Sequence, residues 1–399
     1  MSDELLRRLV TDPAVIADPY PLLRELRETA PVYRVDGADV WVLTRFEDCR
    51  EVLRHPLLGK PEPGDDLPSA LGGAEPVGRG ERSMLFLNPP DHTRLRSLVS
   101  HAFTPRRIEG LRASVEAMTG EVLDSLARSG GGDLIETLAY PLPAAVIGEL
   151  VGVPWADRAR LRPLVADIAL RLEQNRDVDD EQRIKRSHRE LRAYLDDLID
   201  RRRAEPGGDL LSGLIAVADG EDRLSRSELA LTVMLLYAAG FETTTNLIGN
   251  IVHTLLRHPD QLARLRADRS LVPTAVEEVL RFEPPVQLDS RYAFADVEIA
   301  GHVVSKGHSL LVLLGAANRD PAVTDDPDRF DVGRAEVPLL SFASGIHYCL
   351  GASLARLEGQ VALAGLLDRF ATWTALEETP PWKPRFTMRG LERLPVALS

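Results

Sequence analysis

The chain has 399 residues, of which 44% are hydrophobic and 27% charged, and its formal net charge is −13. This composition is typical of a soluble globular protein with room for one to three domains. The acidic charge argues against nucleic acid or an anionic membrane surface as the main partner, because both attract basic proteins. Only two cysteines occur, Cys49 and Cys349, which excludes a disulfide framework and fits a reducing cytoplasm.

The N-terminal residues 1–8 lack the apolar core of a signal peptide, and no run of about 18 apolar residues occurs that could cross a bilayer. The sequence also contains no dinucleotide fingerprint, flavin motif or iron–sulfur cysteine cluster, so electrons for redox chemistry would have to come from separate proteins. We therefore expect a cytoplasmic protein without a membrane anchor.

Residues 1–55 predict short helices and a pair of strands at 32–35 and 40–43. Cys49 lies in a polar helical stretch and is interpreted as structural. Residues 56–83 are rich in Gly, Pro and Asp and predict a long surface loop, which is the kind of loop that is usually functional or mobile.

From residue 91 to about residue 370 the helical signal dominates, with short apolar strands near 292–299 and 310–314. The stretch 203–209 is interpreted as a turn between two helices. No linker or internal repeat divides the sequence, and we therefore expect one mainly α domain that spans residues 1–399.

The first chemically informative motif is Asn-Pro-Pro-Asp-His-Thr-Arg-Leu-Arg, at residues 88–96. It predicts a helix with Asp91 as its cap. His92 and Arg96 are four residues apart and so share one face of that helix, where two donor groups would suit a carboxylate. Arg94 points away from this face and is interpreted as solvated.

A long helix is predicted from the N-cap candidates Ser225 and Ser227, with Glu228 in its first turn, to Arg257. Its centre, residues 239–245, reads Ala-Gly-Phe-Glu-Thr-Thr-Thr. Glycine costs about 1 kcal/mol inside a helix, a buried acid is costly without a partner, and threonine hydroxyls can bend a helix. Several residues that are unfavourable inside a helix thus lie close together, which indicates a functional kink. The alternative is that Glu242 is a core glutamate in a salt bridge and that the threonines only pack against other helices.

Glu278 and Arg281 lie three residues apart on one face of a helix that Pro284 and Pro285 end. Most such pairs are exposed and contribute less than ~1 kcal/mol. The later segment 317–321, Ala-Asn-Arg-Asp-Pro, is interpreted as a scaffold turn without chemistry.

The most informative stretch is Phe-Ala-Ser-Gly-Ile-His-Tyr-Cys-Leu-Gly, residues 342–351. It places Cys349 in a glycine-flanked loop ahead of a long amphipathic segment, 352–370. A helix N-terminus favours the thiolate form of a thiol, while Gly345 and Gly351 let the backbone approach whatever the sulfur binds. A lone thiolate suits a haem iron, and a buried structural cysteine is the alternative.

The pattern Phe-x-x-Gly-x-His-x-Cys-x-Gly resembles the haem-binding loop of the cytochromes P450, with Ala343 where many members have glycine. The resemblance covers nearly the whole chain, because the segments 88–96 and 239–245, the Glu-x-x-Arg pair and the cysteine loop occur in the family's order. It implies the cytochrome P450 fold, an α-rich triangular prism with a small β region, and haem b (iron protoporphyrin IX) as the cofactor.

The resemblance also implies roles for the residues that match. Cys349 would be the axial iron ligand, shielded by Phe342 and flanked by Gly351. The expected partners of the haem propionates are His92, Arg96, Arg291 at the start of a strand, and His347.

On the oxygen side, the resemblance implies a groove made by two small residues, a proton-relaying acid and an alcohol that holds the oxygen. These residues would be Ala239 and Gly240, Glu242, and Thr243. The pair Glu278 and Arg281 would be structural, locked to a third residue that the sequence leaves open between Arg329 and Arg334.

The implied function is a haem-thiolate monooxygenase that inserts one atom of O2 into a C–H bond or an alkene and reduces the other to water. A ferredoxin and a ferredoxin reductase would supply two electrons to what we expect is a monomer. Arg- and Ala-rich usage with few Lys suggests an actinobacterium, where such enzymes often tailor polyketides, terpenes or peptides in antibiotic biosynthesis. A basic patch for an acidic ferredoxin is a hypothesis for Arg106, Arg107 and Arg356.

The substrate pocket is expected to be mostly apolar with a few polar anchors, which suits a large, partly oxygenated molecule. Ordinary core packing is the alternative for each of its residues. The candidates are Phe86, Ala238, Phe241, Val286, Gln287, Leu288, Asp289 and Met388.

Two alternative functions keep the same fold. One is an enzyme of oxidative coupling, peroxide-driven or isomerisation chemistry, and the other is a non-catalytic module that recruits another enzyme. The intact pair Glu242 and Thr243 disfavours both. A haem-free helical binding protein would require all four motifs to be accidental.

Overall fold

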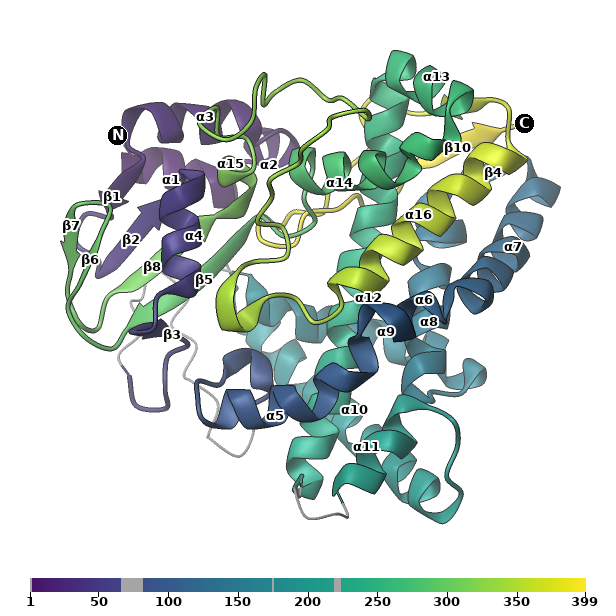
Figure 1. Ribbon diagram of the computed structural model, residues 1–399, viewed down its shortest axis with the longest axis horizontal. Helices are drawn as coiled ribbons and strands as arrows, with labels where there is room; N and C mark the ends of the chain where they lie inside the picture. The colour runs from purple at the N-terminus through teal and green to yellow at the C-terminus, as the bar shows by residue number, and fades with distance from the viewer. Residues whose placement is uncertain (1, 66–81, 174–175, 219–223) are drawn as a thin grey trace.

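The structure is a computed structural model that describes residues 2–65, 82–173, 176–218 and 224–399. Long helices form most of the molecule, and the main sheet lies at one side of it with the N-terminal helices (Figure 1). The structure therefore has the mainly α architecture with a small β region that the sequence predicts. Among the described residues no single helix has the length and apolar composition of a membrane span, and only the bent pair Ile135–Val151 and Trp155–Leu172 meets them jointly.

The α-helices in chain order are α1 (Ser2–Thr11), α2 (Pro13–Ala17), α3 (Tyr20–Thr29), α4 (Phe46–Arg54), α5 (Asp91–Ser100), α6 (Pro105–Glu109), α7 (Arg112–Ser129), α8 (Pro141–Val151), α9 (Trp155–Ala169), α10 (Val178–Ala204), α11 (Leu210–Ala218), α12 (Arg226–Arg257), α13 (Pro259–Ala267), α14 (Val272–Phe282), α15 (Leu314–Ala317) and α16 (Ala352–Arg369). The strands are β1 (Val32–Arg34), β2 (Val40–Leu43), β3 (Leu58–Gly59), β4 (Gly131–Asp133), β5 (Leu288–Ala293), β6 (Val297–Ile299), β7 (His302–Val304), β8 (Ser309–Leu313), β9 (Trp373–Ala375) and β10 (Pro395–Leu398).

The main sheet has the strand order β1-β2-β8-β5-β3. The expected antiparallel pair β1 and β2 is confirmed, and β2 also pairs in parallel with β8, Val40 opposite Ser309. Strand β8 is buried along its whole length. Its consecutive residues Leu310 and Leu311 belong to two different apolar clusters. Neighbouring side chains of a strand point to opposite faces, and both faces of this sheet are covered.

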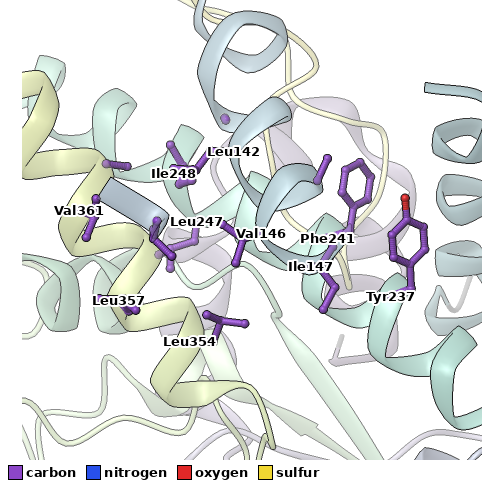
Figure 2. Packing of buried hydrophobic residues seen from close by; sticks show 14 of the residues in the cluster. Leu142, Val146, Ile147, Tyr237, Phe241, Leu247, Ile248, Leu354, Leu357 and Val361 are labelled. Carbon is purple, nitrogen blue, oxygen red and sulfur yellow. The ribbon is translucent and has the colours of Figure 1, made fainter. Parts of the chain in front are cut away.

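Helix α12 crosses the middle of the molecule. Ser225 is its N-cap, in a capping box with Glu228, and the helix ends at Arg257 as predicted. It is buried on nearly every side, against α8 and α16 among others (Figure 2). The Thr243 hydroxyl donates back to the carbonyl of Ala239 at 2.7 Å, yet the helix is unbroken, so the expected kink does not interrupt it.

The sequence predicts an amphipathic helix after the cysteine loop, and this expectation is wrong for α16. Consecutive residues Leu357, Glu358 and Gly359 are all buried, because α7, α12 and α14 surround the helix. Figure 2 shows Leu354, Leu357 and Val361 of α16 facing the residues of α12 and α8. The start of α16 is therefore fixed by packing on several sides, and the cysteine loop ahead of it inherits that rigidity.

The pair in α14 is fully buried, and its third partner is Arg334. Both nitrogens of the Arg281 fork donate to Glu278, at 2.7 and 2.8 Å, and the Nε of Arg334 lies 3.2 Å from each oxygen of the same carboxylate. Arg329, the other candidate, pairs with Asp331 and is mostly exposed. The charge of the buried Glu278 carboxylate is compensated by its two guanidinium partners. These contacts hold α14 to the segment that carries Arg334.

One expectation for α5 is wrong in detail. Asp91 is the first helical residue rather than the cap, because the chain enters the helix directly from Pro90, whose side chain cannot cap. Arg94 is exposed, as expected, and it also forms an ion pair with Glu228 at the start of α12. This contact ties the first turn of α12 to the helix that carries His92.

Candidate active site

A cavity of about 350 Å³ lies between α5, α12, α16 and the cysteine loop. Its wall contains most of the candidate residues from distant parts of the sequence. These are Phe86, His92, Arg96, Ala239, Gly240, Thr243, Val286, Leu288, Asp289, Phe342, His347, Cys349 and Gly351. The candidate motifs therefore surround one space.

The cysteine loop owes its shape to two residues with left-handed backbone. Gly345 has φ +73°, and a Cβ there would lie 2.6 Å from the carbonyl oxygen of Leu53, so only glycine fits. Ala343 has φ +57°, a conformation that costs a non-glycine residue about 1–2 kcal/mol. The residue that departs from the family pattern is thus one whose backbone favours glycine. The loop closes through the Cys349 N–H, which donates to the Phe342 carbonyl at 2.9 Å.

Cys349 lines the cavity, and its side chain is exposed to that space. Burial raises the pKa of the Cys349 thiol above its usual value, and the N–H of Gly351 and the guanidinium groups of Arg96 and Arg356 oppose that shift. The helix N-terminus favours the thiolate whereas desolvation opposes it, so the thiolate form of Cys349 stays a prediction. A bound metal cation would supply the missing positive charge.

One end of the cavity is basic. The rings of His92 and His347 lie 4.4 Å apart between centroids, and Arg96 donates to the Tyr348 carbonyl. Burial lowers the pKa of His92 to about 4 and that of His347 to about 2, so both rings are neutral at pH 7. Among the described residues, His92 Nδ1 and His347 Nε2 are buried without a hydrogen-bond partner.

Beside the histidines lies a buried charged cluster on β5. Arg291 lies within the strand, not at its start, and donates to Asp289 at 2.8 Å. Lys60, which the sequence did not single out, reaches the other oxygen of Asp289, also at 2.8 Å, and lines the cavity. In the described part of the chain, Arg291 Nη2 has no partner although it is buried.

The oxygen-side segment splits in two. Ala239, Gly240 and Thr243 line the cavity, whereas Glu242 lies outside its wall. The Glu242 carboxylate contacts the ammonium of Lys383, a residue 141 positions further along the chain. The carboxylate is thus held by an ion pair, as the alternative interpretation of this helix assumed, although its neighbour Thr243 faces the cavity.

Four pocket candidates lie outside the cavity wall. Ala238 and Phe241 pack in the core, and Gln287 is fully buried with its amide donating to the Pro284 carbonyl at 2.9 Å. Met388 is fixed by its N–H, which donates to Glu173 at 2.8 Å. The wall is formed instead by neighbours of these candidates, because adjacent residues on a strand or helix point in different directions.

A second residue missed by sequence reasoning is Glu358 of α16. It lines the cavity, it is 1% exposed, and among the described residues its Oε2 has no partner. Burial raises the pKa of this carboxyl well above its usual value, which favours its neutral form. Its only sequence signal was an acidic residue on a face of α16 that is otherwise apolar.

The residues present fit a haem. A thiol for the iron, apolar walls for the porphyrin, and a basic end with unsatisfied buried donors for two propionates all line one cavity. Buried donors without partners are costly, and carboxylates would satisfy them. Cys349 would hold the iron, and His92, Arg96 and His347 line the place where carboxylates would lie, while Arg291 lies outside the wall and donates to Asp289.

Comparison with known proteins agrees with this interpretation. The family model "Cytochrome P450" matches residues 177–396. The chain is 42% identical to 6-deoxyerythronolide B hydroxylase of Saccharopolyspora erythraea and 36% identical to the polyketide biosynthesis cytochrome P450 PksS of Bacillus subtilis, each match covering 96% of both chains. Among solved structures, CYP164A2 of Mycobacterium smegmatis superimposes with a TM-score of 0.90 at 42% identity, covering 99% of this chain and 100% of that one.

Proposed function

The chain belongs to the cytochrome P450 family and is a haem monooxygenase, and from this premise we propose that Cys349 ligates the iron of haem b while the apolar wall of the cavity binds the substrate. The observation that carries the proposal is that Cys349 and Thr243, from different halves of the family's machinery, line the same cavity. When bound, haem supplies the redox-active iron at which O2 is activated.

The protein's own contribution begins with the cysteine loop. Its backbone is fixed by the Gly345 turn and by the start of α16, so the position of the Cys349 sulfur does not depend on the ligand. Phe342 lies in the cavity wall beside it, with the Arg356 guanidinium 4.4 Å from its ring centre on the other side. This contact holds the Phe342 ring in place beside the cysteine loop.

Proton delivery falls to α12. The Thr243 hydroxyl lies in the cavity wall and donates to Ala239 O, which leaves its oxygen lone pairs free to accept a further hydrogen bond. Glu242 is the nearest acid along the helix, and its carboxylate forms an ion pair with Lys383. We propose that protons pass from Glu242 to the Thr243 side of the cavity, once the carboxylate turns from Lys383 or a water bridges the two.

The substrate we propose is a mostly apolar small molecule that is hydroxylated or epoxidised. The wall above the basic end is formed by hydrophobic side chains, among them Phe86, Ile147, Leu235 and Val286. A cavity of this kind selects for shape and apolar area, with few polar contacts to fix orientation. The names of the relatives place one in polyketide biosynthesis, and we propose a natural-product substrate for this chain too.

Electrons would come from a ferredoxin and its reductase. The proposed docking surface lies over the cysteine loop, where Ile346 and Tyr348 are about half exposed and α6 contacts α16. Arg106 and Arg107 of α6 are exposed and available to an acidic partner. Arg356 is committed to Glu277, at 2.5 and 2.9 Å, and so contributes less to this surface than the sequence suggested.

The spectrum of the dithionite-reduced protein under carbon monoxide tests the ligand assignment. We expect a Soret band shifted far to the red, as thiolate-ligated ferrous–CO haem gives, and we expect Cys349→Ala to abolish it. Cys49→Ala is the matched control, because Cys49 is buried beneath the sheet and should leave the band unchanged. A histidine-type spectrum that survives Cys349→Ala would overturn the assignment.

A further inference from the structure

We propose that Lys60 is a further ligand of the haem propionates, supplied by the segment after β3 and held in place by Asp289. No motif of the sequence points to this residue. It lies in the cavity wall with His92, Arg96 and His347, and its side chain is 8% exposed. The inference rests on the haem of this family and not on the proposed substrate or redox partner.

Among the described residues, the ammonium of Lys60 has two hydrogen-bond acceptors and so one donor to spare. Its Nζ donates to Asp289 Oδ1 at 2.8 Å and to the Ser290 carbonyl at 3.0 Å, and an ammonium carries three donors. Burial lowers the pKa of Lys60 and the carboxylate of Asp289 opposes the shift. A buried lysine that keeps its charge needs its remaining donor satisfied, and Lys60 lines the shared cavity, where an acceptor could lie.

The position of Lys60 is built into the fold. Its backbone N–H donates to the Asn88 side-chain oxygen at 2.8 Å, and its carbonyl accepts from the Asn88 amide at 2.7 Å. A Cβ on Gly59 would lie 2.3 Å from that same Asn88 oxygen, so the glycine allows the close approach. Because Asn88 lies three residues before the start of α5, Lys60 is fixed relative to His92 and Arg96.

Charge balance points the same way. The basic end of the cavity brings together three cationic side chains, Lys60, Arg96 and Arg291, and one carboxylate, Asp289, beside the rings of His92 and His347. It therefore carries an excess of two positive charges in a buried place. The two propionates of haem carry two negative charges, whereas without Lys60 the same end would balance only one.

A simpler role for Lys60 would be to neutralise Asp289 alone. Asp289 already accepts from Arg291 at 2.8 Å, on its other oxygen. One guanidinium is enough to pair one carboxylate, so the second cation exceeds what Asp289 requires. The Arg291 Nη2 donor is buried and has no partner among the described residues, so the basic end of the cavity can still bind further acceptors.

The test is haem loss from the ferric holoenzyme, measured as transfer to excess apomyoglobin. We expect Lys60→Met to accelerate transfer by about tenfold or more, which corresponds to about 1.4 kcal/mol, while Lys60→Arg keeps most of the retention. Lys306→Met is the matched control, because Lys306 is exposed. The reduced CO spectrum of each variant, recorded on the same samples, reports separately whether thiolate ligation is intact.

The background of Asp289→Asn separates the two roles. If Lys60 contacts a propionate, Lys60→Met accelerates haem loss in that background too, and the propionate bending mode in the resonance Raman spectrum shifts. The inference is wrong if Lys60→Met leaves haem loss unchanged, or if its effect disappears once Asp289 is neutral. If Lys60→Met does not accumulate as holoenzyme, haem loss and the propionate Raman mode are measured on Lys60→Gln instead. An unchanged rate of haem loss together with an unshifted mode would then contradict the inference.

Discussion

Lys383, in the C-terminal segment, contacts the Glu242 carboxylate and also donates to the side-chain oxygen of Asn246 at 2.9 Å, one turn further along α12. The acid that the family pattern assigns to proton relay is thus held by a cation from the far end of the sequence. Two contacts from one ammonium fix both partners, and the carboxylate faces away from the cavity wall that Thr243 joins.

We expect Lys383→Met to free the Glu242 side chain to turn toward Thr243. Because proton delivery then needs no ion pair to break, the kinetic solvent isotope effect on kcat should fall, and the fraction of electrons recovered in product should change. Lys306→Met, an exposed substitution, provides the control. An isotope effect equal to that of the unmodified protein would show that the ion pair does not limit proton transfer.

Glu242→Gln keeps the shape of the side chain and removes its proton-donating acid. We expect kcat to fall by about 100-fold, the usual contribution of a positioned general acid or base. Substrate affinity, followed by the Soret shift on titration, should stay the same because Glu242 lies outside the cavity wall. The exposed Glu378→Gln is the control. Equal losses in kcat and affinity would instead indicate a disturbed cavity.

The choice of Arg334 over Arg329 can be measured as stability. Arg334→Met leaves the fully buried Glu278 with one cation fewer, and we expect a loss of about 3 kcal/mol in the free energy of unfolding. Arg329→Met, whose side chain is 65% exposed, should change it by less than about 0.5 kcal/mol. Denaturant titration of both variants checks the difference, and equal effects would contradict the assignment.

A buried histidine predicts the dependence of stability on pH. His253 packs edge-on against Trp382, and burial lowers its pKa from 6.5 to about 4. The unfolded chain therefore binds this proton more readily than the folded chain, so stability decreases as the pH falls from about 6.5 toward 4. We expect the residue to account for about 2 kcal/mol between pH 7.5 and pH 5.

His253→Phe preserves the aromatic contact with Trp382 and removes the titrating group. The change in its free energy of unfolding between pH 7.5 and pH 5 should therefore be about 2 kcal/mol smaller than that of the unmodified chain. Denaturant midpoints at the two pH values measure this directly. Parallel pH dependence in the two proteins would mean that His253 is not protonated on unfolding.

Features that depend on neighbouring residues could be predicted from the sequence. The Ser225 capping box, the β1–β2 pair and the backbone freedom needed at Gly345 are set within a few residues, where helix and strand periodicity apply. The order of the motifs also predicted that Cys349 and Thr243 would serve one site, and the shared cavity agrees with that hypothesis.

Features that depend on packing could not be predicted in the same way. Lys60 and Lys383 meet their partners across more than a hundred residues of sequence, and periodicity says nothing about such contacts. The pKa of the Cys349 thiol depends on the protein packed around the cysteine loop as well as on the local helix. Arg329 and Arg334 are close in sequence, and only the fold distinguishes them.

The parallel pairing of β2 with β8 has a consequence for synthesis on the ribosome. Strand β2 lies near the N-terminus, yet its neighbour Ser309 opposite Val40 is translated much later. At 5–20 residues per second, about 270 intervening residues take roughly 13–54 s to make. Throughout that interval the edge of β2 that later pairs with β8 has no partner, so the nascent N-terminal segment can pair with other chains unless a chaperone covers it.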